Sequence, residues 1–105
     1  MAYRRTSLLA LGDPTRLAIL EQLADRPQAV VDLARELPVS RPAVSQHLRV
    51  LKDAGLVIDQ AVGNRRIYRV DPDGLAALRD QLDEFWSKAL AAYKVTVEQT
   101  SEEEQ

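Results

Sequence analysis

The stretch between residues 40 and 70 constrains the fold of this 105-residue chain more than any other feature. Apolar residues recur there at the spacing of one buried helix face, and they are Val44, Leu48 and Leu51. Ser40 is a favoured N-cap for such a helix, and Gly55 suits a left-handed C-terminal cap. Two β-prone runs follow at once around Gly63-Asn64, which predicts a hairpin directly after the helix.

Helical patterns occupy most of the remaining chain. Further helices are expected over residues 3–11, 14–24, 30–37 and 72–99. Asp13-Pro14 and Asp71-Pro72 each supply a capping carboxylate and a proline suited to the first helical position. The expected order is helix, helix, helix, helix, hairpin, helix, which predicts a mainly α fold with a small β-hairpin, a winged helix-turn-helix. We expect one domain over residues 1–99 and a disordered acidic tail over 100–105.

Charge is distributed unevenly although the net charge is only −2. The segment 35–69 contains seven basic and three acidic residues, whereas the rest of the chain contains seven basic and thirteen acidic residues. A basic segment with acidic flanks is expected of a surface that faces phosphates. Chance clustering on a solvated face is the alternative that charge alone leaves open.

The polar side of the Ser-capped helix carries groups able to hydrogen-bond to base edges. The candidates for base readout are Arg41, Ser45, Gln46 and Arg49. Ser40 is expected mainly as the helix cap, with a phosphate contact as the alternative. His47 lies at the edge of the buried stripe, so we expect it to be packed or hydrogen-bonded. Asp53 would repel phosphate and is expected to point away.

The helix over residues 30–37 and the Ser-capped helix would form a helix-turn-helix, and the hairpin would form its wing. Phosphate contacts are expected from polar side chains around the Ser-capped helix and on the hairpin. The candidates are Arg35, Ser40, Lys52, Arg65, Arg66 and Arg69. An ordinary solvated turn is the alternative interpretation of the basic hairpin.

Several segments resemble the ArsR family of bacterial winged-helix repressors. They occur in the right order at Leu11–Leu20, Val39–Val57 and Arg65–Tyr68, and the resemblance covers about residues 6–90. It implies a homodimer that binds double-stranded DNA at an operator near its own promoter, with repression relieved by a signal.

Metal-sensing members of that family have ligands that this chain lacks. One type has a Cys-Val-Cys pattern where this chain has Ala29-Val30-Val31, and another uses His on the last helix, whereas His47 is the last His here. The acidic residues Asp80, Asp83 and Glu84 are expected to be solvating groups, because carboxylates alone hold transition metals weakly. We therefore expect no metal and no cofactor. The Phe85-Trp86 segment resembles a metal-independent branch whose effectors are mostly unclear.

The last predicted helix has more apolar surface than a small core can cover, so a second copy of the chain is expected to cover it. Candidate interface residues are Leu8, Leu9, Leu78, Leu82, Phe85, Trp86, Ala89 and Tyr93. Packing within one chain and a ligand pocket near Trp86 are the alternatives.

Other classes of protein find less support in the sequence. An enzyme is disfavoured because the chain has no cysteine, one histidine and no glycine-rich phosphate loop. No apolar run approaches the ~20 residues that span a membrane, and the N-terminus lacks a signal-peptide pattern, so a cytoplasmic protein is expected. A winged-helix module that binds only proteins, and a sensor with an unrecognised ligand site, remain alternatives. The operator, the inducing signal and the choice between activator and repressor stay open.

Overall fold

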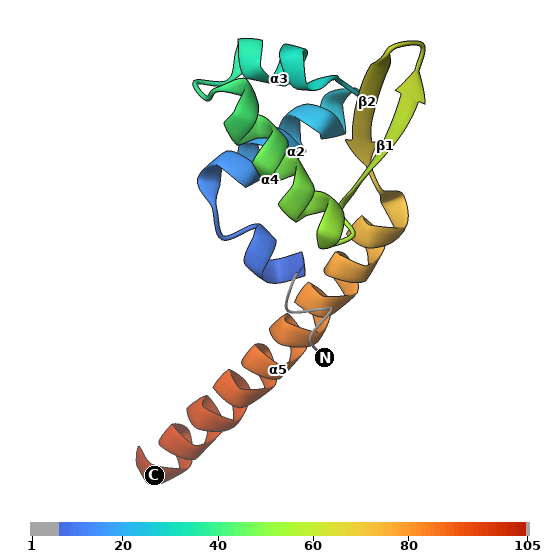
Figure 1. The fold of residues 1–105 in the computed structure, drawn as a ribbon. Helices are drawn as coiled ribbons and strands as arrows, with labels where there is room; N and C mark the ends of the chain where they lie inside the picture. Colours follow the sequence, from blue (N-terminus) through green and yellow to red (C-terminus); the bar gives the residue numbers. More distant parts are fainter. Residues whose placement is uncertain (1–6, 105) are drawn as a thin grey trace.

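The computed structural model describes residues 7–104 and arranges its helices and hairpin in the predicted order (Figure 1). The elements are α2 (Pro14–Asp25), α3 (Val30–Glu36), α4 (Arg41–Asp53), β1 (Val57–Val62), β2 (Arg65–Val70) and α5 (Pro72–Glu104). Residues 7–10 form a short helical segment before α2, and the rest of the expected first helix, residues 3–6, lies outside the described residues. The predicted mainly α fold with one hairpin is confirmed.

Local capping explains where the helices begin and end. The Asp13 carboxylate accepts hydrogen bonds from the backbone N–H groups of Arg16 (3.1 Å) and Thr15 (2.8 Å), so α2 begins at the Asp-Pro signal. The bond from the Arg16 N–H is the main reason that the pKa of Asp13 lies below its ordinary value. Ser40 caps α4 by accepting from the Ala43 N–H at 3.3 Å. Gly55 follows α4 with a φ of 79°, the left-handed conformation predicted for it.

The core lies where α2, α3, α4 and the base of the hairpin meet. The fully buried side chains are Ile19, Leu33, Val44, Leu48, Leu51, Leu56 and Val57. The predicted inward face of α4 is thereby confirmed. The buried Ser7 hydroxyl donates to the Ala54 carbonyl at 2.9 Å and ties the N-terminal segment to the end of α4.

The hairpin is antiparallel, and its register runs from Val57 opposite Val70 to Val62 opposite Arg65 around the Gly63-Asn64 turn. Gln28, just before α3, pairs with Tyr68 through backbone hydrogen bonds of 3.0 and 2.8 Å. The segment that enters α3 therefore lies along β2, and the hairpin is attached to the helix-turn-helix by main-chain bonds.

Helix α5 is longer than the sequence suggested. It extends away from the body and gives the molecule its longest dimension of 71 Å (Figure 1). We expected it to end near Gln99 and residues 100–105 to be disordered, but the helix continues to Glu104. No Gly or Pro follows Gly74, and the Thr96 and Thr100 hydroxyls donate to backbone carbonyls one turn earlier, so nothing local ends the helix. Among the residues that the structure describes, no helix combines the length and the apolar composition needed to span a membrane.

Gly74 sits where the first turn of α5 passes the loop after α4. A Cβ atom there would overlap the Gly55 carbonyl oxygen, which belongs to backbone and cannot swing away. We therefore expect Gly74→Ala to lower the free energy of unfolding by about 1–3 kcal/mol. Urea unfolding followed by circular dichroism measures the effect. The control is Ala76→Ser at an exposed position of α5, expected to change stability by less than about 0.5 kcal/mol; equal losses for both variants would contradict the close approach.

Candidate nucleic-acid interface

Helix α4 is held at a fixed angle by α3 and by its own buried side. The connection between the two helices is short, with the Leu37 N–H bonded to the Leu33 carbonyl and the Val39 N–H bonded to the Leu37 carbonyl. Val44 and Leu48 are 0% exposed, so rotation of α4 about its axis would bring apolar groups into water. This is the geometry of a helix-turn-helix, in which one helix supports a second that faces outward.

The outward side of α4 contains all four predicted base-reading residues. We call them the recognition face, and they are Arg41, Ser45, Gln46 and Arg49, each exposed. Most of them line a shallow surface depression of about 470 Å³ together with Pro42, Val50 and Asp53. Asp53 thus lies on this surface, whereas we expected it to point away, because it follows Arg49 by four residues and shares its side of the helix.

A groove separates α4 from the hairpin, which we call the wing. It has a volume of about 400 Å³, and it is lined by Ser45, Leu48, Arg49, Lys52, Asp53 and Tyr68.

Tyr68 and Val70 of β2 pack against the core, so alternate residues of the strand, including Arg66, share that side. Arg69 falls on the other side of the ribbon and is exposed there. The structure therefore separates Arg69 from Lys52 and Arg66.

Asp59 connects the end of α4 to the wing. Its Oδ1 lies 2.8 Å from Lys52 Nζ, and its Oδ2 lies 2.6 Å from an Arg66 guanidinium nitrogen. The Asp59 side chain is only 8% exposed, whereas those of Lys52 and Arg66 are 53% and 57% exposed. Hydrogen bonds from Lys52 and then from Arg66 hold the pKa of Asp59 below its ordinary value.

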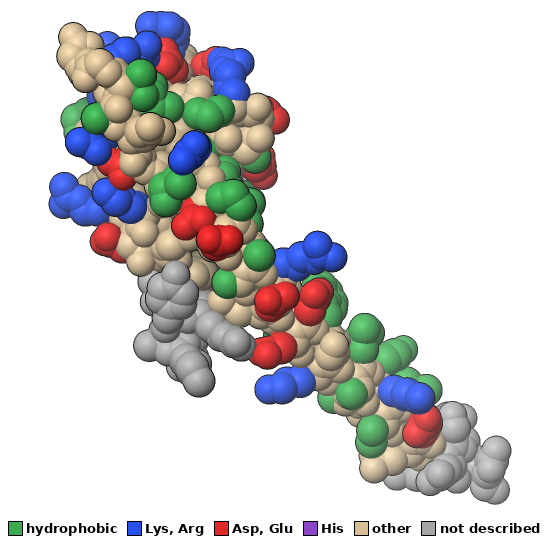
Figure 2. All heavy atoms as spheres, turned by 90° about the vertical axis from the view of Figure 1, so that its right-hand side faces the viewer, with side chains coloured by type: hydrophobic (Ala, Val, Ile, Leu, Met, Phe, Trp, Pro, Cys, Tyr) green, Lys and Arg blue, Asp and Glu red, His purple; other side chains and the backbone are tan. Residues whose placement is uncertain are grey.

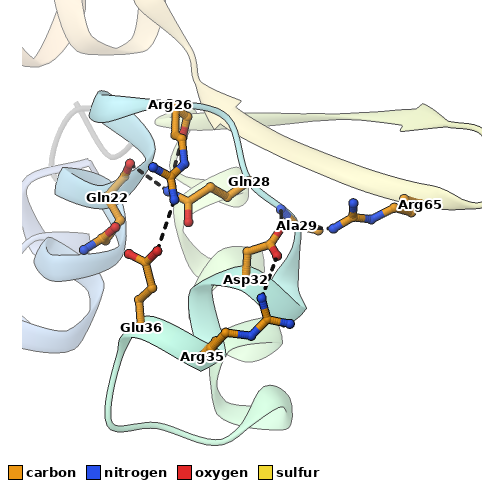
Figure 3. Close-up of polar contacts among 8 residues, drawn as sticks. All are labelled: Gln22, Arg26, Gln28, Ala29, Asp32, Arg35, Glu36 and Arg65. Atoms are coloured by element: carbon orange, nitrogen blue, oxygen red, sulfur yellow. Dashed lines mark hydrogen bonds and ion pairs between the residues drawn. The ribbon is translucent and has the colours of Figure 1, made fainter.

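Asp32 plays a similar part at the start of α3 (Figure 3). One of its carboxylate oxygens lies 2.9 Å from Arg65 of the wing and 3.4 Å from the Ala29 N–H, and the other lies 3.9 Å from Arg35. The carboxylate thereby caps the first turn of α3 and holds two predicted phosphate-binding cations. Nearby, Arg26, which directly follows α2, forms an ion pair of 3.1 Å with Glu36 at the end of α3 (Figure 3).

The remaining predicted site residues take simple positions. The hydroxyl of Ser40 serves as the helix cap, as the sequence favoured. His47 is half-buried with its Nδ1 3.5 Å from an Arg16 guanidinium nitrogen, which confirms the packed interpretation. Among the side chains that the structure describes, those of residues 7–100, Arg41, Arg49 and Arg69 form no ion pair, and all three residues are exposed.

Hydrophobic side chains lie along the protruding part of α5 (Figure 2), and several of the predicted interface residues belong to this part of the helix. Three large aromatic residues there are mostly exposed: Phe85 is 60% exposed, Trp86 57% and Tyr93 68%. Leu9, from the N-terminal segment, is 73% exposed. Also exposed are Leu8 and Leu82, and Ala89 is half-buried. Leu78 differs from the expectation, because the first turns of α5 pack on the body and leave it 6% exposed in the core of its own chain.

Comparison with known proteins agrees with this geometry. Residues 13–59, from the cap of α2 to Asp59, match the family described as bacterial regulatory protein, arsR family. The HTH-type transcriptional regulator Rv2034 of Mycobacterium tuberculosis (strain ATCC 25618 / H37Rv) is 64% identical over 84 residues, which cover 80% of this chain and 78% of that protein. The chain belongs to the ArsR family.

Two further similarities extend over most of the chain. The arsenical resistance operon repressor of Staphylococcus xylosus is 33% identical over 85 residues, covering 79% of this chain and 82% of that protein. The solution structure of the homodimeric winged helix-turn-helix DNA-binding domain Mb0332 from Mycobacterium bovis is 28% identical with a TM-score of 0.68, covering 85% of this chain and 82% of that domain. As an ArsR-family member this chain is a DNA-binding transcriptional regulator and not an enzyme.

Two carboxylates, Asp32 and Asp59, organise the basic residues of this ArsR-family surface, and neither was among the predicted site residues. Asp59 is one of the three acids in segment 35–69, and the hairpin register by itself puts it opposite Tyr68 and diagonal to Arg66. No such signal exists for Asp32, because its contact with Arg65 joins residues 33 positions apart. Among the described residues, no group of three or more His, Asp or Glu has an arrangement suited to a metal ion.

Proposed function

We propose that this ArsR-family regulator is a homodimeric repressor that reads a pseudo-palindromic operator through the recognition face of α4. The observation that carries the proposal is that this face is exposed, while the opposite face of the same helix is fully buried. A polar face presented on a fixed helix suits insertion into the major groove, where base edges show a distinct pattern of donors and acceptors.

Each group of the recognition face has a role in this proposal. The guanidinium groups of Arg41 and Arg49 suit the acceptors of guanine, and the Gln46 amide suits the donor and acceptor of adenine. The Ser45 hydroxyl can donate a hydrogen bond to, or accept one from, the edge of either base. Arg41 lies at the start of α4, where recognition helices approach DNA most closely.

Phosphate contacts are assigned to the residues that surround this face. In the proposal these are Arg35, Ser40, Lys52, Arg65, Arg66 and Arg69. Arg35, Ser40 and Arg41 line one depression of about 380 Å³ between α3 and α4, which is a suitable place for one phosphate. Arg69 has the weakest support because it lies on the opposite side of the wing from Arg66 and, unlike Arg65, forms no ion pair with a described residue of α3.

Homodimer formation is supported by the uncovered apolar surface of α5 and residues 7–10. The contacting side chains are proposed to be Leu8, Leu9, Leu82, Phe85, Trp86, Ala89 and Tyr93. Phe85 and Trp86 meet edge to face at 5.8 Å between ring centroids, which makes a compact aromatic anchor. The homodimeric state of the Mb0332 domain supports the same assembly.

The dimer would place two copies of α4 in successive major grooves, about 34 Å apart. Bound there, it would exclude RNA polymerase from the promoter, and the repressor among the relatives supports this direction of control. We also propose that the protein is cytoplasmic and belongs to a metal-independent branch, since it lacks the cysteines and the C-terminal histidines of metal-sensing types.

Replacement of Gln46 tests base readout. We expect Gln46→Ala to weaken binding to a site selected from random DNA by about 1–3 kcal/mol and to relax the preference at one base position, because a bidentate contact is lost. Fluorescence anisotropy on the selected site and on scrambled DNA measures both quantities. Gln99→Ala, an exposed glutamine on α5, is the matched control and should leave both unchanged. An equal loss on selected and scrambled DNA would remove Gln46 from base readout.

Replacement of Arg65 tests a phosphate contact of the wing. We expect Arg65→Ala to weaken binding to every sequence and to make the slope of log K against log salt shallower by about one unit, because one fewer counterion is released. The slope is measured by titration at several salt concentrations. Arg79→Ala removes an exposed arginine from α5 and should keep the wild-type slope. A wild-type slope for Arg65→Ala would show that Arg65 does not contact phosphate.

Replacement of Trp86 tests the dimer. We expect Trp86→Glu to weaken dimerisation by at least about 2 kcal/mol, roughly 30-fold in Kd, because it removes an aromatic anchor and buries a charge. Sedimentation velocity over a concentration series measures the Kd. Ser87→Glu adds the same charge at the adjacent exposed position and is expected to have a smaller effect. If both variants dimerise like the wild type, this face of α5 is not the interface.

A further inference from the structure

We propose that Asp59 is a specificity-determining positioning residue of this regulator, holding Lys52 and Arg66 in one fixed arrangement that only a correctly registered DNA backbone matches. The inference rests on the proposed DNA-binding surface, and it assigns to a carboxylate a role in a surface otherwise described by its cations. Asp59 itself need not touch DNA for this role.

The geometry joins three elements through one side chain. Asp59 belongs to β1, Arg66 to β2, and Lys52 to the last turn of α4. The two cations contact different oxygens of the carboxylate, at 2.8 Å for Lys52 and 2.6 Å for Arg66. The angle between the recognition helix and the wing is therefore set partly by ion pairs, in addition to the backbone that connects them.

Asp59 is far more buried than its two partners, Lys52 and Arg66. The carboxylate is almost covered, while more than half of each cationic side chain remains in contact with solvent. A phosphate that approaches from outside can therefore reach Lys52 and Arg66 without displacing Asp59. The ion pairs with Asp59 restrict the side chains of the two cations in the free protein, so a phosphate at the right position binds groups that are partly ordered in advance.

The same carboxylate lowers affinity for DNA in general. A negative charge beneath two cations reduces the local positive potential that drives binding to any sequence. A phosphate in the wrong register also competes with Asp59 for each cation. Asp59 is thus expected to reduce nonspecific binding, while its positioning of the two cations raises specific binding, and the ratio of the two affinities is the quantity that reveals it.

The first experiment compares Asp59→Asn with Asp80→Asn. Both variants remove one negative charge, and Asp80 is an exposed residue of α5 away from the recognition face and the wing. Affinities are measured by anisotropy for a site selected by the wild type and for random DNA at equal salt. For Asp59→Asn we expect affinity for random DNA to rise about threefold and the specificity ratio to fall about tenfold. For Asp80→Asn the ratio should change by less than about twofold.

Two outcomes overturn the proposal at this stage. If Asp59→Asn keeps a specificity ratio within twofold of the wild type, Asp59 acts through charge or stability alone, since either would change both affinities by one factor. If Asp80→Asn lowers the ratio as much as Asp59→Asn, total charge is responsible. A wild-type protein that prefers no sequence would instead refute the proposed operator reading, which distinguishes that failure from failure of this inference.

A second set of variants keeps the proposal testable if Asp59→Asn does not fold. Lys52→Gln combined with Arg66→Gln removes both partners of the carboxylate while leaving it in place. We expect this double variant by itself to lose specificity. Where Asp59→Asn folds, its addition to the double variant should lower the ratio by less than about twofold, because no partner is left to position. Hydrogen exchange of the wing amides should also accelerate in the double variant. Retained specificity in the double variant would overturn the proposal.

Discussion

Burial of one face of α4 is the constraint on which the rest of the structure depends. Val44, Leu48 and Leu51 are completely enclosed, and each buried side chain of this kind contributes about 1.5–3 kcal/mol relative to exposure. Because the helix cannot rotate without exposing them, the opposite face has one orientation. The recognition face is thus defined by apolar packing, and its polar groups are free to serve DNA because none is needed to hold the helix.

Around this fixed helix, two carboxylates organise the cations. Asp32 holds Arg35 and Arg65, and Asp59 holds Lys52 and Arg66, so most of the predicted phosphate-binding side chains already have an acidic partner. The cationic partner is more than half exposed in each of these ion pairs, so the pairs contribute little to stability and their value lies in orientation. A surface built in this way presents ordered cations at reduced local charge, which favours discrimination over general attraction to nucleic acid.

Helix α5 divides its apolar residues between two tasks. Leu75 and Leu78, in its first turns, pack on the core of the same chain, and Gly74 permits the close approach that this packing requires. Beyond that point the helix leaves the body, and Phe85, Trp86 and their neighbours remain uncovered. One continuous stripe in the sequence therefore serves folding at one end and, in the proposed dimer, is covered by a second copy at the other.

The sequence by itself determined the order of the elements, the caps at Asp13, Ser40 and Gly55, and the two faces of α4, because caps and helical periodicity are local properties of the chain. Only the tertiary structure decided which cations share a carboxylate, where Arg69 faces and that Leu78 is internal. It also extended α5 to Glu104. Contacts such as Asp32 with Arg65 join distant residues, and their partners follow from how the hairpin packs beside α3, which no local pattern specifies.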